Sequence, residues 1–184
     1  NYQTFETGSV LRKIAASGSE VGNKVKERIE HGKLVDTDLI MDVIGEWLDQ
    51  QETKDNIIFD GIPRSEEQRV GFEKLMNQHD MDFLPVLIDI TENESRYRLG
   101  ARRICQSCNY APLSTYTGEK CPECEGDLAV RADDADPEAI EQRLSVYRDE
   151  TLPMVQQYEK VGKVLKADGM LDIQDIYQTI ADQL

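Results

Sequence analysis

The chain has 184 residues, 39% of them hydrophobic, which is long enough to bury one good core. Its short periodic apolar runs argue against disorder, and no apolar stretch approaches the length of a membrane span. Lysine and arginine number 21 against 36 aspartates and glutamates, so the formal net charge of −15 argues against non-specific binding to nucleic acid.

The first half of the chain alternates short strands with helices. The predicted elements are a strand over 2–6, helices over 9–17, 20–31 and 36–50, a strand over 57–59 and a helix over 65–78. Gly18 and Gly32 end the first two helices, as glycine commonly does after a helix C-terminus.

The second half continues the alternation. The predicted elements are a strand over 84–90, a helix over 91–103, a cysteine-containing segment over 104–130, a long helix from Asp136 that breaks near Pro153, a strand at 164–165 and a helix over 173–183. The apolar run 84–90 is typical of a parallel strand covered on both faces. The alternation predicts a parallel sheet in an α/β layer fold, with ligands bound beyond the carboxyl ends of the strands.

Four cysteines form the most specific pattern: two C-x2-C pairs separated by twelve residues, Cys105, Cys108, Cys121 and Cys124. Four thiolates make a closed tetrahedral site that suits zinc, and the absence of an open position makes that zinc structural. Two disulfides in a secreted protein and a rubredoxin-like iron site are the alternatives.

Seven of the eleven arginines fall between residues 96 and 148: Arg96, Arg98, Arg102, Arg103, Arg131, Arg143 and Arg148. Clustered guanidinium groups in an acidic chain indicate a polyanionic ligand such as phosphate, because each binds two phosphate oxygens at once. The alternative is that they form salt bridges with the abundant carboxylates.

The segment from Asp60 to Gln68 follows the strand over 57–59. Gly61 would let the backbone approach a ligand, and Arg64 would stand at the carboxyl edge of the sheet. Ser65 and Gln68 also have the spacing of a capping box. The Gln68 amide therefore caps the helix or, alternatively, pairs with an adenine.

In this order, the segments resemble the adenylate kinase family, specifically its zinc-lidded bacterial type. The resembling segments are Thr7-Gly8-Ser9-Val10-Leu11-Arg12, Gly32-Lys33-Leu34-Val35, Asp60-Gly61-Ile62-Pro63-Arg64 with Gln68, Arg98, Arg102-Arg103, the cysteines, Arg131-Ala132-Asp133-Asp134 and Gln142-Arg143-Leu144. Together they cover essentially the whole chain.

The resemblance implies an α/β fold with a three-layer parallel sheet of the P-loop NTPase, nucleoside monophosphate kinase type, and an inserted zinc-binding lid. The core would comprise 1–6, 36–101 and 135–184, the AMP-binding insertion 7–35, and the lid 102–134. The implied activity is reversible phosphoryl transfer from ATP to AMP, giving two ADP, in nucleotide biosynthesis. We expect Mg²⁺ with ATP, structural Zn²⁺, a cytoplasmic monomer, and neither nucleic acid nor membrane as partner.

The resemblance also implies the site residues. AMP would be bound by Thr7, Gly8, Arg12, Lys33, Leu34, Val35, Gly61, Arg64, Gln68, Arg131 and Arg143. ATP would be bound by Arg98, Arg102, Ala111 and Leu171. The catalytic groups would be Arg64, Arg98, Arg102, Arg131, Arg143 and Asp60, with Asp60 holding magnesium through water.

The main departure from the family is that the 184 residues contain no G-x-x-x-x-G-K loop. The sequence starts at Asn1, just where the family's first strand and that loop would have ended. We therefore expect a truncated N-terminus, a chain inactive as given, and poor solubility from an exposed sheet edge. A catalytically inactive nucleotide- or zinc-binding relative, a UMP/CMP kinase and a zinc-ribbon nucleic-acid binder remain alternatives.

Overall fold

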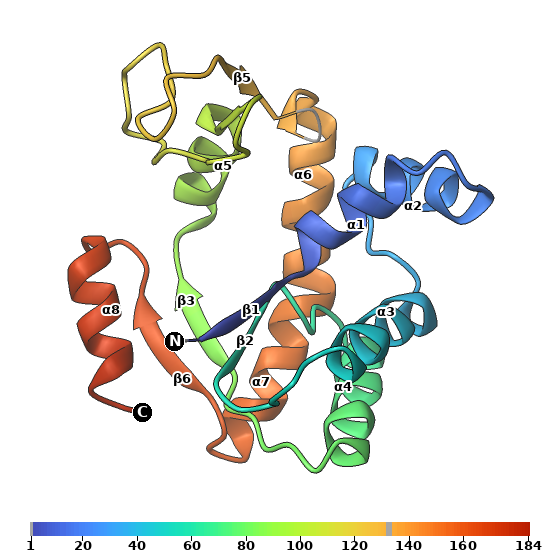
Figure 1. Ribbon diagram of the computed structural model, residues 1–184. Coiled ribbons are helices and arrows are strands. Elements are labelled where there is room, and N and C mark those ends of the chain that lie inside the picture. Colours follow the sequence, from blue (N-terminus) through green and yellow to red (C-terminus); the bar gives the residue numbers. More distant parts are fainter. Residues whose placement is uncertain (1, 132–133) are drawn as a thin grey trace.

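The computed structural model describes residues 2–131 and 134–184 (Figure 1). Its elements are, in chain order, β1 Gln3–Glu6, α1 Thr7–Ala15, α2 Glu20–Glu30, α3 Thr37–Asp49, β2 Ile57–Asp60, α4 Glu66–Gln78, β3 Val86–Asp89, α5 Glu92–Ala101, β4 Arg103–Cys105, β5 Leu128–Val130, α6 Pro137–Val146, the π-helical turn η2 Tyr147–Thr151, α7 Leu152–Lys160, β6 Leu165–Asp168 and α8 Ile173–Ala181. The predicted alternation of strands and helices is confirmed, with ends that differ by a few residues.

Side-chain caps fix where several of these helices begin. The Thr91 hydroxyl accepts from the backbone N–H of Glu94 at the start of α5, over 3.2 Å. The Asp36 carboxylate caps α3 in the same way, by accepting from Leu39. Each cap satisfies an N–H that has no partner within the helix. The residues next to each helix start therefore determine where that helix begins.

The parallel strands of the described residues form two separate pairs. β1 runs beside β2 with Gln3 opposite Ile57, and β3 runs beside β6 with Val86 opposite Leu165. Figure 1 shows both pairs at the centre of the molecule. The family implies one continuous sheet, whereas β2 and β3 are not paired here.

The prediction that residues 84–90 are covered on both faces is wrong. Val86 and Ile88 are 42% and 50% exposed, while Leu87 between them packs against the cluster around Met154 of α7. Successive side chains of a strand point to opposite faces. Only the Leu87 face is covered by described residues, so the apolar residues on the other face remain in solvent.

An edge-to-face series of aromatic rings runs through the core. Phe5 of β1 meets Trp47 of α3, and Phe59 of β2 meets Phe72 of α4, at centroid distances of 5.3 and 5.1 Å. Phe72 then meets Phe83, 5.2 Å away, and Phe83 meets Tyr158 of α7. Because such pairs add to the free energy gained from apolar burial, the series stabilises the contact between the first strand pair and α7.

The helix that begins at Pro137 continues to Lys160, so the predicted break near Pro153 is wrong. The π-helical turn η2 comes directly before α7, and Pro153 lies in the first turn of α7. Proline cannot donate the backbone hydrogen bond of a regular helix. The change from α to π hydrogen bonding therefore occurs where the chain must accommodate this residue.

Two segments flank the upper part of α6 in Figure 1. On one side are the paired helices α1 and α2, and on the other is the cysteine-containing segment between α5 and α6. In that segment β4 and β5 pair antiparallel, with Arg103 opposite Val130. No helix in the described part of the chain is long and apolar enough to cross a membrane.

Candidate functional site

The loop after β2 folds closely around the side chain of Arg64. Gly61 has φ +79°, and a Cβ at this position would lie 2.6 Å from Nη2 of Arg64. The Nε–H of Arg64 donates to the Gly61 carbonyl over 2.7 Å. Glycine is therefore required here for its backbone conformation and for the space that the guanidinium occupies.

Four of the predicted arginines converge on this loop. Desolvation by the surrounding protein lowers the pKa of Arg64, and the positive charges of Arg143, Arg131 and Arg102 lower it further, against the opposing effect of Asp60. Water still reaches Arg64. Because an anion would relieve the repulsion among these guanidinium groups, the place where they gather is a candidate phosphate site.

Asp134 holds two of these arginines, a role that the sequence analysis did not assign. Its side chain is fully buried and accepts from Nε and Nη2 of Arg102, over 2.7 and 2.9 Å, and from Nη1 of Arg143. The feature of the sequence that could have indicated this role is the pair of aspartates that comes shortly after Arg131. Ala132 and Asp133, which belong to the same predicted segment, lie outside the described residues.

A second group of predicted residues lies at the carboxyl end of β1. Glu6 stands opposite Asp60 in the register, so Thr7 and Gly61 follow neighbouring strands at the same edge. Thr7 is buried, and its hydroxyl has no hydrogen-bond partner among the described residues. A buried hydroxyl without a partner costs free energy, so it suits contact with a ligand.

Close packing also determines the neighbours of Gly8 and Gly32. A Cβ on Gly8 would lie 3.1 Å from Nη1 of Arg12, so the Arg12 guanidinium lies over this glycine. Gly32 has φ +67°, and its Cβ would lie 2.5 Å from the Ala139 carbonyl oxygen and 3.1 Å from Cγ of Arg143. The loop that starts at Gly32 therefore lies directly against α6.

The remaining residues of that loop differ in their surroundings. Lys33 is exposed, the Leu34 carbonyl accepts from Nη1 of Arg28 over 3.0 Å, and Val35 is buried in the main apolar cluster. Val35 thus anchors a loop that reaches the arginine cluster through the contact between Gly32 and Arg143.

Gln68 caps α4. Its backbone N–H donates to the Ser65 hydroxyl, and its side-chain Oε1 accepts from the backbone N–H of Arg64 over 2.9 Å. The capping interpretation is confirmed, with the amide reaching one residue beyond the helix cap. Gln68 is also buried, so its position next to Arg64 is fixed.

Arg98 lies at a different place from the four-arginine cluster. Its Nε donates to Glu94 over 2.6 Å and its Nη2 to the Gly169 carbonyl over 2.9 Å. Leu171, two residues further along, is 46% exposed. The structure thus brings Arg98 to the loop that carries Leu171, whereas Ala111 is exposed on the cysteine-containing segment.

Three of the predicted arginines have structural contacts. Arg96 binds Glu141 and Glu92, and Arg148 binds Glu92, so that α5 is tied to α6 and η2. Arg103 donates to the carbonyls of Tyr116 and Gly118 in the loop between the cysteine pairs. The alternative of salt bridges with carboxylates is confirmed for Arg96 and Arg148, whereas Arg103 bonds to backbone carbonyls instead.

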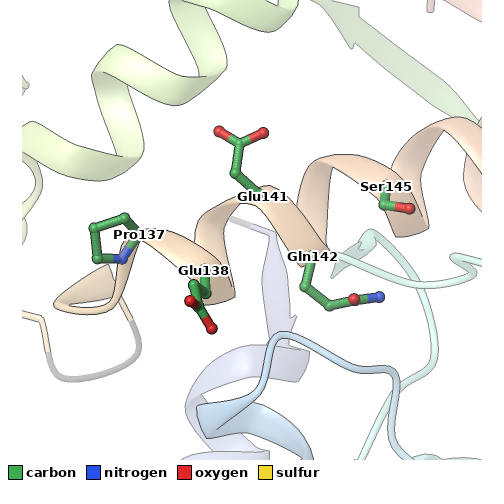
Figure 2. A pocket seen from close by; sticks show the side chains of 5 residues that line it. All are labelled: Pro137, Glu138, Glu141, Gln142 and Ser145. Carbon is green, nitrogen blue, oxygen red and sulfur yellow. The ribbon is translucent and has the colours of Figure 1, made fainter.

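The α6 surface shown in Figure 2 bears a depression of about 390 Å³. Pro137, Glu138, Glu141, Gln142 and Ser145 line it, and Glu141 points to the opposite side of the helix from Gln142. This lining has two carboxylates and no cation, so it does not suit a phosphate.

The four cysteines form one compact cluster. Their sulfurs lie within 4.8 Å of one another, with 3.5 Å between Cys105 and Cys124 and 3.6 Å between Cys108 and Cys121. A disulfide would need about 2.05 Å, so the disulfide alternative is wrong for this structure. Tetrahedral thiolates at about 2.3 Å from zinc would lie about 3.8 Å apart, so the donor set fits zinc.

Two of these thiols already differ in acidity. Hydrogen bonds to the Cys105 sulfur, above all from the backbone N–H of Cys108, lower the pKa of Cys105 to about 6. The backbone N–H of Tyr110 also lowers the pKa of Cys108, but neighbouring sulfurs and desolvation outweigh it and raise that pKa to about 12. Backbone N–H groups thus favour a thiolate at Cys105, the form that binds metal.

Comparison with known proteins places the chain in one family. The family model described as adenylate kinase matches residues 1–163. The chain belongs to the adenylate kinase family. An adenylate kinase of Thermosipho africanus is 31% identical to it, over 98% of this chain and 86% of its own length. One of Zymomonas mobilis is 33% identical, over 98% and 83%.

This membership confirms the resemblance to the adenylate kinase family seen in the sequence. It makes the chain a nucleotide-binding phosphotransferase of the nucleoside monophosphate kinase type, with a fold of the P-loop NTPase class. An adenylate kinase of Dehalococcoides mccartyi, 33% identical over 95% of this chain and 82% of its own length, agrees. Family membership does not by itself identify the residues that bind each substrate, and these are inferred from the local geometry.

Proposed function

We propose that this protein transfers a phosphoryl group reversibly from ATP to AMP, giving two ADP. The observation that carries the proposal is the convergence of Arg64, Arg102, Arg131 and Arg143 in a chain of net charge −15. Phosphoryl transfer requires positioning and charge stabilisation rather than a covalent nucleophile. Guanidinium groups from separate elements supply both.

AMP would lie between the ends of β1 and β2 and the insertion 7–35. Its phosphate would meet Arg12 and Arg64, and the partnerless hydroxyl of Thr7 would gain a ligand contact. The backbone around Gly8, Gly61 and 33–35 would line the nucleotide. The Gln68 amide would meet the adenine, and Arg131 with Arg143 would contact the phosphates of both nucleotides.

ATP would lie on the other side of the arginine cluster. Arg98 and Arg102 would bind its phosphates, and the backbone at Leu171 and Ala111 would border its base. Mg²⁺ would accompany ATP, and Asp60, an exposed carboxylate at the end of β2, would hold it through water. The ion would neutralise part of the phosphate charge.

The segment 102–134 would act as a lid with zinc bound by Cys105, Cys108, Cys121 and Cys124. Structural zinc contributes about 10–16 kcal/mol to the folding of small peptides at neutral pH. That is ample for a segment whose described β-structure is the short pairing of 103–105 with 128–130 and a bridge between Lys120 and Asp127. A closed lid would exclude water, which otherwise hydrolyses ATP.

Turnover would further require a phosphate-binding loop, since the 184 residues contain no G-x-x-x-x-G-K segment. The arginines lie at the candidate AMP site and beneath the lid, so they do not replace backbone N–H groups around the ATP phosphates. We therefore propose that the 184 residues bind nucleotide but transfer phosphate very poorly without that loop.

Calorimetric titration of AMP tests the nucleotide site. The wild-type chain should bind AMP, and Arg64→Ala should weaken binding by about 100-fold or more, as for the loss of a charged phosphate clamp. Arg148→Ala is the matched control, because Arg148 is 47% exposed and binds Glu92. Equal affinities for wild type and Arg64→Ala would refute the site.

Titration with UMP and CMP separates the nearest alternative, a pyrimidine nucleotide kinase. The buried Gln68 amide favours adenine, so AMP should bind more tightly than either pyrimidine nucleotide. Formation of ADP from ATP and AMP, assayed with the same chain carrying an N-terminal strand and phosphate-binding loop, distinguishes an enzyme from an inactive relative. A loop-bearing protein that still formed no ADP would contradict the proposed activity.

A further inference from the structure

Both backbone polar groups of Arg64, its N–H and its carbonyl, form hydrogen bonds, and its guanidinium bonds to another residue of the same loop. Its N–H donates to Oε1 of Gln68, and its Nε–H donates to the Gly61 carbonyl. Its carbonyl accepts from the hydroxyl of Thr151 over 2.7 Å. Gln68 and Gly61 are close neighbours in sequence, whereas Thr151 lies 87 residues away on the helix that carries Arg143.

The π-helical turn accounts for the position of Thr151. In an uninterrupted α-helix, eight residues rotate through about 800°, which would leave Thr151 about 80° away from the face of Arg143. The π turn Tyr147–Thr151 inserts one residue and turns the following chain back by about 100°. Thr151 then lies within about 20° of the Arg143 face, the side on which Arg64 lies.

A crevice lies beside the bond between Thr151 and Arg64. This crevice of about 390 Å³ separates the start of α4 from η2 and α7, and its walls carry Glu66 and Glu67 on one side and Asp149 and Glu150 on the other. Like charges on the two walls repel each other. Arg69 binds Glu66 and so offsets part of this repulsion on one wall. The hydrogen bond from Thr151 joins the two segments across the crevice.

We propose that Thr151 is a positioning residue: its hydroxyl, presented by the π turn, fixes the main chain of Arg64 and thereby aims the guanidinium at the AMP phosphate. The choice of AMP as the ligand rests on the proposed function, whereas the hydrogen bond between Thr151 and Arg64 does not. The same hydroxyl links the phosphate clamp to the helix of Arg143, so both arginines keep one relative position.

Three variants of Thr151 test the proposal by AMP calorimetry. Thr151→Val keeps the shape and removes the hydroxyl, and it should weaken AMP binding by about 3- to 10-fold, the usual worth of one net hydrogen bond. Thr151→Ser keeps the hydroxyl and should restore most of the affinity. If the valine variant does not fold, Thr151→Ala provides the same comparison at a position where alanine favours helix.

Thr179→Val is the matched control, because the Thr179 hydroxyl also donates to a carbonyl, that of Asp175, over 2.8 Å within α8. It should leave the AMP affinity unchanged. Thermal melting of every variant checks that the fold is retained. Equal AMP affinity in wild type, Thr151→Val and Thr151→Ala would overturn the positioning role.

An NMR measurement separates failure of this inference from failure of the proposed function. The Nε–H of Arg64 is hydrogen-bonded to Gly61, and its resonance can be assigned by its loss in Arg64→Lys. In Thr151→Val this Nε–H should exchange with water several-fold faster, with or without AMP. An unchanged exchange rate would overturn the inference even if AMP binds, and faster exchange would support it even if AMP does not.

Discussion

Asp134 fixes the positions of two of the four converging guanidinium groups. Its fully buried carboxylate binds Arg102 through two nitrogens and Arg143 through one. Since Arg102 and Arg143 would otherwise repel each other, Asp134 sets their separation before any phosphate arrives. An arriving anion then has to compete with this carboxylate, or to bind the guanidinium N–H groups that Asp134 leaves available.

Replacing Asp134 by Asn should therefore destabilise the protein without ligand. The amide leaves two guanidinium groups without their counter-charge, and removing one partner of a buried ion pair costs about 3–5 kcal/mol. Arg102 and Arg143 are 30% and 21% exposed, so water recovers part of this, and we expect the free energy of unfolding to fall by about 1–3 kcal/mol.

Urea unfolding measures the effect. Asp127→Asn is the control. The Asp127 side chain is 79% exposed and pairs with Lys120, and such surface pairs contribute about 0–1 kcal/mol to the free energy of unfolding. A fall no larger for Asp134→Asn than for Asp127→Asn would show that Asp134 does not hold the cluster.

At the scale of single residues, the sequence drew attention to the arginine-rich stretch but did not predict the partners of its members. The arginine-rich stretch was evident, and Arg102, Arg131 and Arg143 do meet Arg64. Nothing in the spacing distinguished them from Arg96, which binds Glu141 on the neighbouring helix 45 residues away. Such pairings depend on how two helices cross, and that is decided by packing over the whole fold.

The proposed lid, 102–134, is the element that we expect to depend most clearly on a single bound ion. Its cysteines bring 105–108 and 121–124 together, and Arg103 supports the loop between them. In Cys121→Ser, loss of one buried thiolate should lower both the zinc content and the melting temperature. AMP binding should largely remain, because all the proposed AMP residues except Arg131 lie outside the lid.

Metal analysis, differential scanning calorimetry and AMP titration of the same preparation test this expectation. Chelator treatment of the wild type should reproduce the lower melting temperature and leave Cys121→Ser almost unaffected. Unchanged zinc content in Cys121→Ser would show that the four-cysteine assignment is wrong.

The contact between α5 and α6 should weaken in acid. Hydrogen bonds from Arg96, with a smaller contribution from its charge, lower the pKa of Glu141. A group with a lowered pKa stabilises the folded state above its unfolded pKa, here about 4.3, and loses that contribution as the pH falls through the folded value. Glu141→Gln should therefore melt lower than wild type at pH 7, and the difference should vanish well below pH 4.

Thermal melts across this pH range provide the check, with Glu46→Gln as the control. Glu46 lies on α3 and has no ion pair in the described part of the chain, so it reports the effects of acid and metal loss common to all variants. A difference between wild type and Glu141→Gln that stayed constant down to the lowest pH would contradict the role of the ionised pair.

Most elements could be predicted because their signals are local. The cap at Thr91 and the apolar face of the helix over 36–50 are determined by residues within a few positions of each other. The π turn could not be predicted in this way. Pro153 indicated a disturbance, but whether a helix breaks or changes its hydrogen bonding depends on distant partners such as the loop at Arg64, to which Thr151 donates a hydrogen bond.

For the whole molecule, the notable feature is apolar strand surface in solvent. Ile58 of β2 and Ile88 of β3 are 48% and 50% exposed, on strands that belong to different pairs. The exposure of Ile88 contradicts the prediction that 84–90 is covered, while the expected exposed sheet edge stays a prediction. The apolar run by itself indicated burial, and only the arrangement of the other strands decides whether such a run is covered on one face or on both.

This surface makes a final prediction about association. Unpaired strand edges with exposed β-branched side chains promote non-specific association between chains. The 184-residue chain should therefore scatter light increasingly at micromolar concentrations and above. Ile88→Thr keeps the β-branched shape, places a hydroxyl in solvent and should raise the concentration at which scattering begins by about two-fold or more, as a gatekeeper substitution does.

The matched control is Val161→Thr, since Val161 is 66% exposed but lies after α7, away from any strand. It should leave the onset of scattering unchanged, because a single exposed apolar residue is normal on a protein surface. Equal onset for all three proteins would show that the strand surface is not the cause. If both substitutions raised the concentration at which scattering begins by the same factor, the added hydroxyl itself would be the cause. Of the two residues, Ile88 lies on a strand and Val161 does not.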